Sequence, residues 1–214
     1  MERLIAKDLL KIKAVFLRPE EPFTWASGIK SPIYCDNRLT LSDVAVRSDV
    51  EHALAKIIQD NYPGCEAVMG TSTAGIAHAA IVSEILGLPM GYVRGSAKDH
   101  GRNNRIEGRC EPGTKVVVVE DLISTAGSAV DVAEALREAG AEVLGIASIF
   151  TYGMKKGTDR LAEHGLKNVS ASNYDALLEV ASEEGYIGAA QIPALKAFRD
   201  DPSDESWMEA LKQA

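Results

Sequence analysis

The stretch KVVVVEDLISTAGS, residues 115–128, contains the strongest predicted strand of this chain. Four consecutive valines at 116–119 are typical of a strand buried on both faces, as in a parallel sheet covered by helices. Small and polar residues follow at 124–128, and apolar residues at helical spacing then run over 128–139, before Gly140. The stretch therefore predicts a buried strand, a tight turn and a helix.

Similar strands and helices alternate on both sides of this unit. Gly and Pro residues separate them, as at 62–64 and 87–89, and Ser42 is the predicted cap of one helix. This alternation predicts an α/β fold with a central parallel sheet flanked by helices. The predicted strands cover 67–69, 90–93, 115–119 and 143–150, and the predicted helices cover 42–60, 74–86 and 128–139.

The two ends of the chain have different patterns. Residues 3–17 carry apolar residues at helical spacing and predict an amphipathic helix. Residues 22–41 are rich in aromatic, Gly, Ser and Pro residues, which indicates a short hairpin or irregular segment. The tail predicts helices near 173–184, 193–199 and 203–213. The length of 214 residues, without an internal repeat, predicts a single domain over residues 1–214.

Composition limits the function. A net charge of −8 disfavours general nucleic-acid binding, because phosphate contacts require an excess of Lys and Arg. The apolar stretches are far shorter than the roughly 20 residues that span a bilayer, so we expect no membrane segment. The charged N-terminal stretch does not resemble a signal peptide. Cys35, Cys65 and Cys110 form no CxxC pair, so we expect free thiols, no structural zinc and a cytoplasmic location.

The turn after the valine strand has the composition of a phosphate-binding loop. Small residues let backbone N–H groups approach an anion, and the N-terminus of the next helix adds partial positive charge. Ser124, Thr125 and Ser128 add hydroxyl donors. Glu120 and Asp121 would repel phosphate, but suit sugar hydroxyls or a magnesium ion held through water. The pattern indicates a ribose 5-phosphate pocket. A plain strand–turn–helix connection, with Ser128 as the helix cap, would have the same pattern.

A second loop, GTSTAG at 70–75, also joins a predicted strand to a predicted helix. It begins like a Walker A loop, but Ile76 and Ala77 stand where Lys and Ser or Thr are required, which disfavours a nucleoside triphosphatase. Neither GxGxxG after a strand nor GxSxG occurs, so a nicotinamide site and a nucleophile elbow are unsupported. Thr71 and Ser72 therefore lie in a second anion-friendly turn or in a plain Gly-rich one.

Residues 94–109, RGSAKDHGRNNRIEGR, form a cationic segment in an acidic chain. Five basic residues against two acidic ones give it a net charge of +3. A long polar loop of this kind is usually functional or disordered. Positive charge on a loop suits a lid over a polyanion, since closure excludes water and strengthens each charge contact. A solvated surface loop has the same composition.

The central motif resembles a known family. The branched run, the acidic pair and Ser-Thr-Ala-Gly-Ser resemble the phosphoribosyl diphosphate signature of type I phosphoribosyltransferases, with Ala126 where Gly is frequent. The resemblance implies their fold, a parallel sheet flanked by helices with a small N-terminal hood. It implies that the loop of Thr71 and Ser72 holds pyrophosphate. It also implies that the substrate is bound by Glu120, Asp121, Leu122, Ile123, Ser124, Thr125, Ala126, Gly127 and Ser128.

Two further motifs resemble orotate phosphoribosyltransferases in particular. Arg94 followed by AKDHG at 97–101 is similar to their catalytic loop, and FTWASGIKSP at 23–32 is similar to their hood. The resemblance implies that Arg94, Lys98 and His100 bind pyrophosphate in the neighbouring subunit of a homodimer. It implies that Lys30 binds substrate.

The same resemblance divides the single domain into three parts. The hood is built mainly from about residues 1–41, the core from about 42–155 and a helical tail from about 156–214. It implies a reaction in de novo pyrimidine biosynthesis, in which orotate and phosphoribosyl diphosphate give orotidine 5′-monophosphate and pyrophosphate. Lys98, His100 and Asp121 would be catalytic. Magnesium would be the cofactor, held by substrate oxygens and water beside Glu120 and Asp121, with no direct protein ligand.

The chain departs from many relatives at three positions. Ala26 and Ala74 stand where Lys is frequent, and Tyr152 lies near the position of an Arg. These departures indicate a changed base pocket rather than a different group transfer. Two alternatives stay open: a phosphoribosyltransferase for another base, and a non-catalytic regulator that senses phosphoribosyl diphosphate. The acidic charge disfavours the regulator, which would need a nucleic-acid surface.

Overall fold

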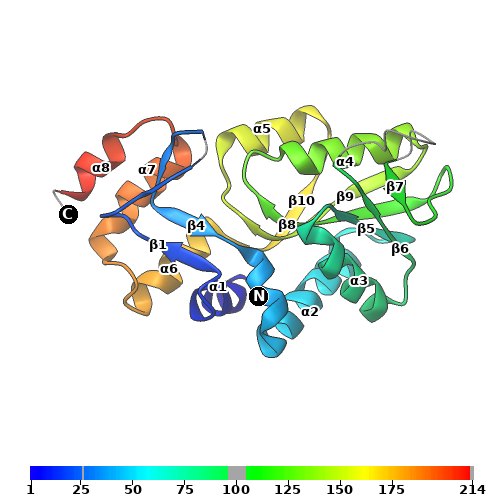
Figure 1. Ribbon diagram of the computed structural model, residues 1–214, viewed down its shortest axis with the longest axis horizontal. Coiled ribbons are helices and arrows are strands. Elements are labelled where there is room, and N and C mark those ends of the chain that lie inside the picture. Colours follow the sequence, from blue (N-terminus) through cyan, green and yellow to red (C-terminus); the bar gives the residue numbers. More distant parts are fainter. Residues whose placement is uncertain (26, 96–104, 213–214) are drawn as a thin grey trace.

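The computed structural model describes residues 1–25, 27–95 and 105–212. A six-stranded sheet lies at the centre of this part of the chain (Figure 1). All neighbouring strands are parallel except the edge pair β6 and β7. In spatial order the strands are β10 (Asn168–Asn173), β9 (Glu142–Thr151), β8 (Lys115–Ile123), β5 (Ala67–Thr71), β6 (Met90–Val93) and β7 (Ile106–Glu107). The predicted α/β fold with a parallel sheet is confirmed.

The valine run forms the centre of the sheet. Val116 to Val119 are completely buried in β8. Because successive strand residues point to opposite faces, Val117 and Val119 join one buried cluster, whereas Val116 and Val118 join another. Each face therefore needs its own cover of helices.

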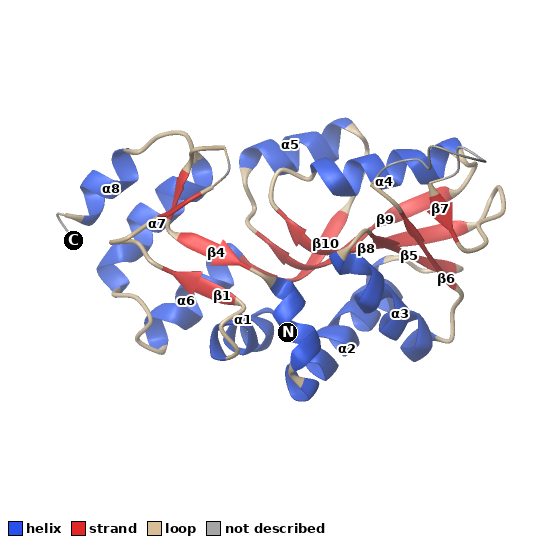
Figure 2. Cartoon of the chain, in the orientation of Figure 1, coloured by secondary structure: helices blue, strands red, loops and turns tan. Residues whose placement is uncertain are grey.

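Two pairs of helices supply this cover (Figure 2). Helices α2 (Val44–Asn61) and α3 (Ala74–Leu86) pack on the face of Val117 and Val119. Helices α4 (Gly127–Glu138) and α5 (Lys155–Glu163) pack on the opposite face. The predicted cap of α2 is wrong by one residue: Asp43, not Ser42, accepts the first backbone N–H groups of the helix. An aspartate at this position satisfies donors that have no intrahelical partner.

The N-terminal part contains less helix and more β-strand than the sequence predicts. Helix α1 ends at Lys11 (Glu2–Lys11), and Lys13, with φ 58°, turns the chain into strand β1 (Val15–Leu17). The predicted helix over 3–17 is therefore too long, because the apolar residues at its end fit the periodicity of a helix as well as that of a short strand. Strand β1 pairs with β4 (Ile33–Cys35). A hairpin of β2 (Phe23–Thr24) and β3 (Lys30–Ser31) lies between them in sequence, and the 3-10 helix η1 (Asn37–Ser42) follows β4.

The C-terminal part contains the three predicted helices, the last one shorter than expected. They are α6 (Tyr174–Glu183), α7 (Ile192–Asp200) and α8 (Ser206–Leu211), with the 3-10 turn η2 (Ala189–Gln191) before α7. The expected tail, helical from about residue 156, differs at β10, which extends the sheet beside β9. The sequence of β10, NVSASN, is mostly polar and lacks the apolar run by which the other strands were predicted.

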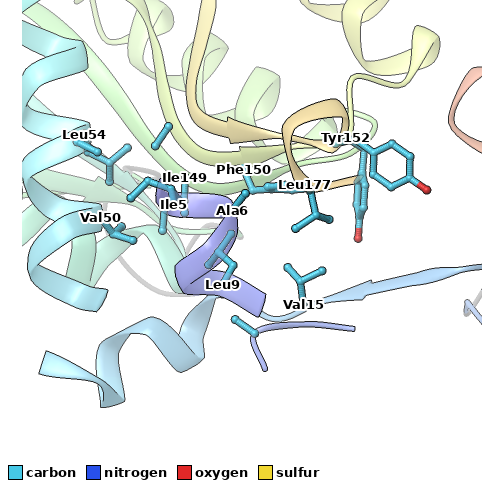
Figure 3. Packing of buried hydrophobic residues seen from close by; sticks show 14 of the residues in the cluster. Ile5, Ala6, Leu9, Val15, Val50, Leu54, Ile149, Phe150, Tyr152 and Leu177 are labelled. Carbon is cyan, nitrogen blue, oxygen red and sulfur yellow. The ribbon is translucent and has the colours of Figure 1, made fainter. Parts of the chain in front are cut away.

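Both ends of the chain share a core with the sheet. Figure 3 shows Ile5 and Leu9 of α1 near Ile149 of β9, with Leu177 of α6 in the same cluster. Trp207 of α8 also belongs to this cluster. Over residues 1–25, 27–95 and 105–212, no helix has both the length and the apolar content needed to cross a membrane.

Candidate functional site

The candidate phosphate-binding loop, residues 124–128, lies at the carboxyl end of β8, at the sheet edge where α/β proteins bind ligands. The strand continues through the acidic pair to Ile123, and α4 begins at Gly127. Ala126 stands just before the helix with φ 58°, and no side chain caps the helix. The first N–H groups of a helix have no intrahelical partner, so the start of α4 can bind an anion.

The hydroxyl of Ser128 has a different partner from the one that the sequence suggests. It lies inside α4 and is not the cap. Its Oγ donates to Glu120 Oε2 at 3.0 Å. The hydroxyl therefore holds a carboxylate rather than standing free for a phosphate, and the loop's remaining side-chain donors are Ser124 and Thr125.

Glu120 is buried and links the two loops. Its side chain accepts a hydrogen bond from Thr71 Oγ1 at 2.7 Å and one from the N–H of Asp121 at 3.0 Å. With Ser128 this makes three donors from β5, β8 and α4. Burial, with the Asp121 carboxylate beside it, raises the pKa of Glu120 to about 8. The Glu120 side chain thus joins β5, β8 and α4, and its carboxylate binds a proton readily near neutral pH.

Asp121 has a more open side chain than Glu120, and its peptide is held on both sides. Its N–H donates to Glu120, as above, and its carbonyl accepts from Asn37 Nδ2 at 2.7 Å. This leaves the carboxylate as the acidic group of the pair that can reach a ligand. Asn37 was not predicted as a site residue, because in the sequence it is one polar residue among many within the segment 22–41.

The second loop lies beside the first. Strand β5 ends at Thr71 and α3 begins at Ala74, so Ser72 stands in the connection, as predicted. Ser72 Oγ donates to the carbonyl of Val93 in β6 at 2.5 Å. Gly75 brings α3 against β8: a Cβ there would lie 2.5 Å from Thr71 Oγ1 and 2.5 Å from the carbonyl of Val119. Glu120 links the two loops, because it accepts from Thr71 of one and from Ser128 of the other.

The ends of the cationic segment are anchored to the protein. Arg94 forms an ion pair with Glu107 at 3.1 Å. Arg105 donates to Asp131 of α4 at 3.0 Å and to the carbonyl of Arg94 at 2.9 Å. The segment therefore starts beside the second loop, because β6 pairs with β5. Lys98 and His100 lie outside the described residues.

Among the described residues of the hood, Trp25 and Ile29 line the cleft beside the site. Lys30 Nζ donates to Thr24 Oγ1 at 2.7 Å within the hairpin. Trp25 packs on Tyr152 at 6.0 Å between ring centroids. Of the three positions where the resemblance predicts a cation that this chain lacks, Ala74 is the first residue of α3, Tyr152 is buried, and Ala26 lies outside the described residues.

A cleft of about 710 Å³ opens between the hood and the candidate phosphate-binding loop. Trp25 and Ile29 line it on one side and Thr125 on the other, with Lys155 and Lys156 at the start of α5. Its walls also carry Arg160 and four acidic side chains, so both signs of charge line the cleft beside the Trp25 ring; the acidic residues are Asp159, Glu163, Asp200 and Asp201.

The acidic pair fits magnesium that arrives with a substrate. Asp121 offers a partly exposed carboxylate, whereas the oxygens of Glu120 already accept three hydrogen bonds. Within the described ranges, His, Cys, Asp and Glu do not gather in groups of three that could hold a metal. Magnesium commonly keeps several waters and binds through one or two carboxylates together with substrate phosphates.

Comparisons with known proteins show the family to which the chain belongs. A phosphoribosyl transferase domain family matches residues 42–177. The orotate phosphoribosyltransferase of Bacillus cereus (strain G9842) is 56% identical over 210 residues, which cover 98% of this chain and 100% of that protein. The crystal structure of orotate phosphoribosyltransferase from Aeropyrum pernix aligns with a TM-score of 0.74 and 31% identity, over 86% of this chain and 99% of that one.

The UMP synthase of Leishmania donovani has the same fold, with a TM-score of 0.78 and 27% identity. The match covers 92% of this chain but 41% of that longer one. The resemblance found in the motifs is thus confirmed over nearly the whole chain. The chain belongs to the orotate phosphoribosyltransferase family and is an enzyme with the type I phosphoribosyltransferase fold.

Proposed function

We propose that this chain transfers the 5-phosphoribosyl group of phosphoribosyl diphosphate to orotate. The products are orotidine 5′-monophosphate and pyrophosphate, in de novo pyrimidine biosynthesis. The observation that carries the proposal is the contact between two anion-friendly loops through Glu120, which receives donors from Thr71 and Ser128. The names of the relatives from Bacillus cereus and Aeropyrum pernix supply the acceptor base.

The loop after β8 is the proposed site of the ribose 5-phosphate. The uncapped start of α4 and the backbone over Ser124 to Ser128 would bind the phosphate, with Leu122 and Ile123 leading into it. Asp121 would accept hydrogen bonds from the ribose hydroxyls and favour positive charge on the ribose. Glu120 would hold Asp121 and Thr71 in place. Thr71 and Ser72 would border the pyrophosphate.

The reaction needs positioning and charge stabilisation rather than a covalent nucleophile. N1 of orotate would attack C1 of the ribose as the bond to pyrophosphate breaks, leaving positive charge on the sugar and negative charge on the leaving group. Arg94, Lys98 and His100 would stabilise the leaving group, and Lys98 would give it a proton. Magnesium, when bound, supplies charge neutralisation on the pyrophosphate, and Asp121 would hold it through water. Lys30 would contact the substrate from the hood.

Loss of orotate absorbance tests the proposed reaction. Purified protein is mixed with orotate, phosphoribosyl diphosphate and magnesium, and a sample without magnesium is the control. We expect magnesium-dependent loss of orotate. If the protein binds phosphoribosyl diphosphate but orotate persists, a panel of other bases separates a different acceptor from a protein that only senses phosphoribosyl diphosphate.

Lys98 has the largest expected effect on turnover. Lys98→Ala should lower kcat about 10²–10³-fold, because it removes one charged donor from the developing negative charge. Arg109→Ala is the matched control: it lies in the same cationic segment, is largely exposed and pairs with Glu111. Steady-state kinetics compare the three proteins. Unchanged turnover in Lys98→Ala would remove this role.

We also propose that the chain acts as a homodimer whose cationic segment serves the neighbouring active site. Lys98→Ala and Asp121→Asn would each be nearly inactive alone. After the two are mixed and allowed to exchange subunits, half of the dimers should be hybrids with one intact site, which restores about a quarter of wild-type activity. No recovery, with exchange shown by mass spectrometry of differently tagged subunits, would place the segment over its own site.

A cytoplasmic location and the absence of nucleic-acid and membrane partners stay predictions from the sequence, as does the division into hood, core and tail.

A further inference from the structure

Asn37 connects the hood to the acidic pair. It is the first residue of η1, two positions after the end of strand β4, and is 1% exposed. Its Nδ2 donates to the carbonyl of Asp121 at 2.7 Å, and its Oδ1 accepts from Cys35 Sγ at 3.2 Å. Both polar atoms of the buried amide are therefore used, one toward the hood strand and one toward the end of β8.

The hydrogen bond from Asn37 to the Asp121 carbonyl lies where the main-chain pairing between β5 and β8 has ended. The ladder between β5 and β8 ends at the pair Gly70 and Val119, before the strand reaches Asp121. The Asp121 carbonyl, in a partly buried place beyond the end of this ladder, needs another donor, since an unpaired carbonyl shielded from water is costly. The Asn37 side chain supplies that donor. Asp121 is thus held by its N–H through Glu120 and by its carbonyl through the hood.

The orientation of the amide follows from its neighbours. A backbone carbonyl can only accept, so the Nδ2 end must face Asp121. The Oδ1 end then needs a donor, which the Cys35 thiol provides. Burial raises the pKa of this thiol above its ordinary value, so it stays protonated and able to donate. Asp36 fixes the start of η1 by accepting from the N–H of Arg38 at 3.2 Å.

We propose that Asn37 is a positioning residue that fixes the Asp121 carboxylate for the ribose and so sets the affinity for phosphoribosyl diphosphate. The inference rests on the proposed function for the role of Asp121. Cys35 acts on the same bond by holding the amide in the donating orientation. The hood therefore contributes to binding of the sugar as well as bordering the base.

Asn37→Leu tests this role, because leucine has a similar size but can neither donate nor accept. The matched control is Asn61→Leu, since Asn61 Nδ2 also donates to a backbone carbonyl, that of Ile57 at 3.1 Å, at the end of α2. We expect Asn37→Leu to raise the KM for phosphoribosyl diphosphate roughly 10- to 100-fold, as for a displaced positioning group, with the KM for orotate near the wild-type value. Asn61→Leu should keep both constants.

A second pair of variants covers the case in which Asn37→Leu does not fold. Cys35→Ala removes the donor to Oδ1, whereas Cys35→Ser keeps one. We expect a smaller rise of the same KM in Cys35→Ala and rescue in Cys35→Ser. Equal kinetics for Cys35→Ala and Cys35→Ser, or for Asn37→Leu and Asn61→Leu, would overturn the proposal.

Calorimetric binding of phosphoribosyl diphosphate separates this inference from the proposed reaction. If the wild type binds it but leaves orotate unchanged, the acceptor base is wrong, and the weaker binding expected of Asn37→Leu is still measurable. If Asn37→Leu binds as tightly as the wild type while orotate is consumed, the reaction stands and the role of Asn37 fails. A wild type that does not bind phosphoribosyl diphosphate overturns both.

Discussion

At the scale of single residues, Glu120 makes stability depend on pH. Its pKa, raised to about 8 in the fold from 4.5, means that the folded state holds a proton which the unfolded chain releases at lower pH. The contribution is fully present below pH 4.5 and is lost as pH rises through about 8. Glu120→Gln keeps the shape and the acceptor for Thr71 but cannot titrate. We expect its melting temperature to fall less than that of the wild type between pH 5 and pH 8.5.

Thermal melts of both proteins across this range measure the difference, which isolates Glu120 from other titrating groups. A control is Glu111→Gln, because Glu111 lies on the surface beside Arg109. Parallel curves for the wild type and Glu120→Gln would show that the proton is not held in the fold.

The sequence identifies the reactive residues better than their partners. The acidic pair and the loop were found from composition, because strand ends in parallel sheets meet at one edge. The inward turn of Glu120 was not predictable, since its partner Thr71 comes from another strand. His78 of α3 is completely buried, and its Nδ1 lies 2.6 Å from Oε1 of Glu51 in α2, a pairing that the sequence does not predict. Spacing along the chain does not report such pairings.

At the scale of elements, the close approach of α3 to β8 depends on Gly75. Any side chain there meets Thr71 and the carbonyl of Val119, as its Cβ would stand 2.5 Å from both atoms. Gly75→Ala should therefore push α3 and the second loop away from β8. Overpacking of this kind costs about 1–3 kcal/mol. We expect a lower melting temperature and a lower kcat/KM for phosphoribosyl diphosphate.

Gly188→Ala is the control for this prediction, because the nearest atom to its added Cβ is 3.7 Å away. Calorimetric melts and steady-state kinetics of both variants give the comparison. Similar stability and kinetics in the two would mean that α3 can shift without affecting the loop.

The elements found from the sequence are those with one clear periodicity. Helix α3 and strand β6 have the predicted bounds, since Gly and Pro residues delimit them. Strand β10 was missed because its residues are polar and its place in the sheet depends on β9. Strand β1 was merged with the first helix, because three apolar residues cannot distinguish a helical turn from a short strand.

At the scale of the whole molecule, a chain of aromatic rings joins the C-terminal helices to the hood. Trp207 of α8 packs on Phe198 of α7 at 5.7 Å, Phe198 on Trp25 at 5.9 Å, and Trp25 on Tyr152. Trp207 is 1% exposed, so its ring anchors α8 in the core. The contact with the hood was not predictable, because it brings together opposite ends of the chain.

Removal of Trp207 should therefore affect both stability and the cleft beside Trp25. Trp207→Ala deletes a buried ring and should cost about 3–5 kcal/mol, which lowers the melting temperature by about 2–4 °C for each kcal/mol in a chain of this size. Because Phe198 loses its support, Trp25 should shift and the KM for orotate should rise. Trp207→Phe keeps a ring at this place and should keep most of the stability, with a KM for orotate near the wild-type value. Tyr186→Ala, at a residue that is 51% exposed, is the control. A large loss of stability with an unchanged KM for orotate would show that the aromatic chain supports the fold without reaching the base.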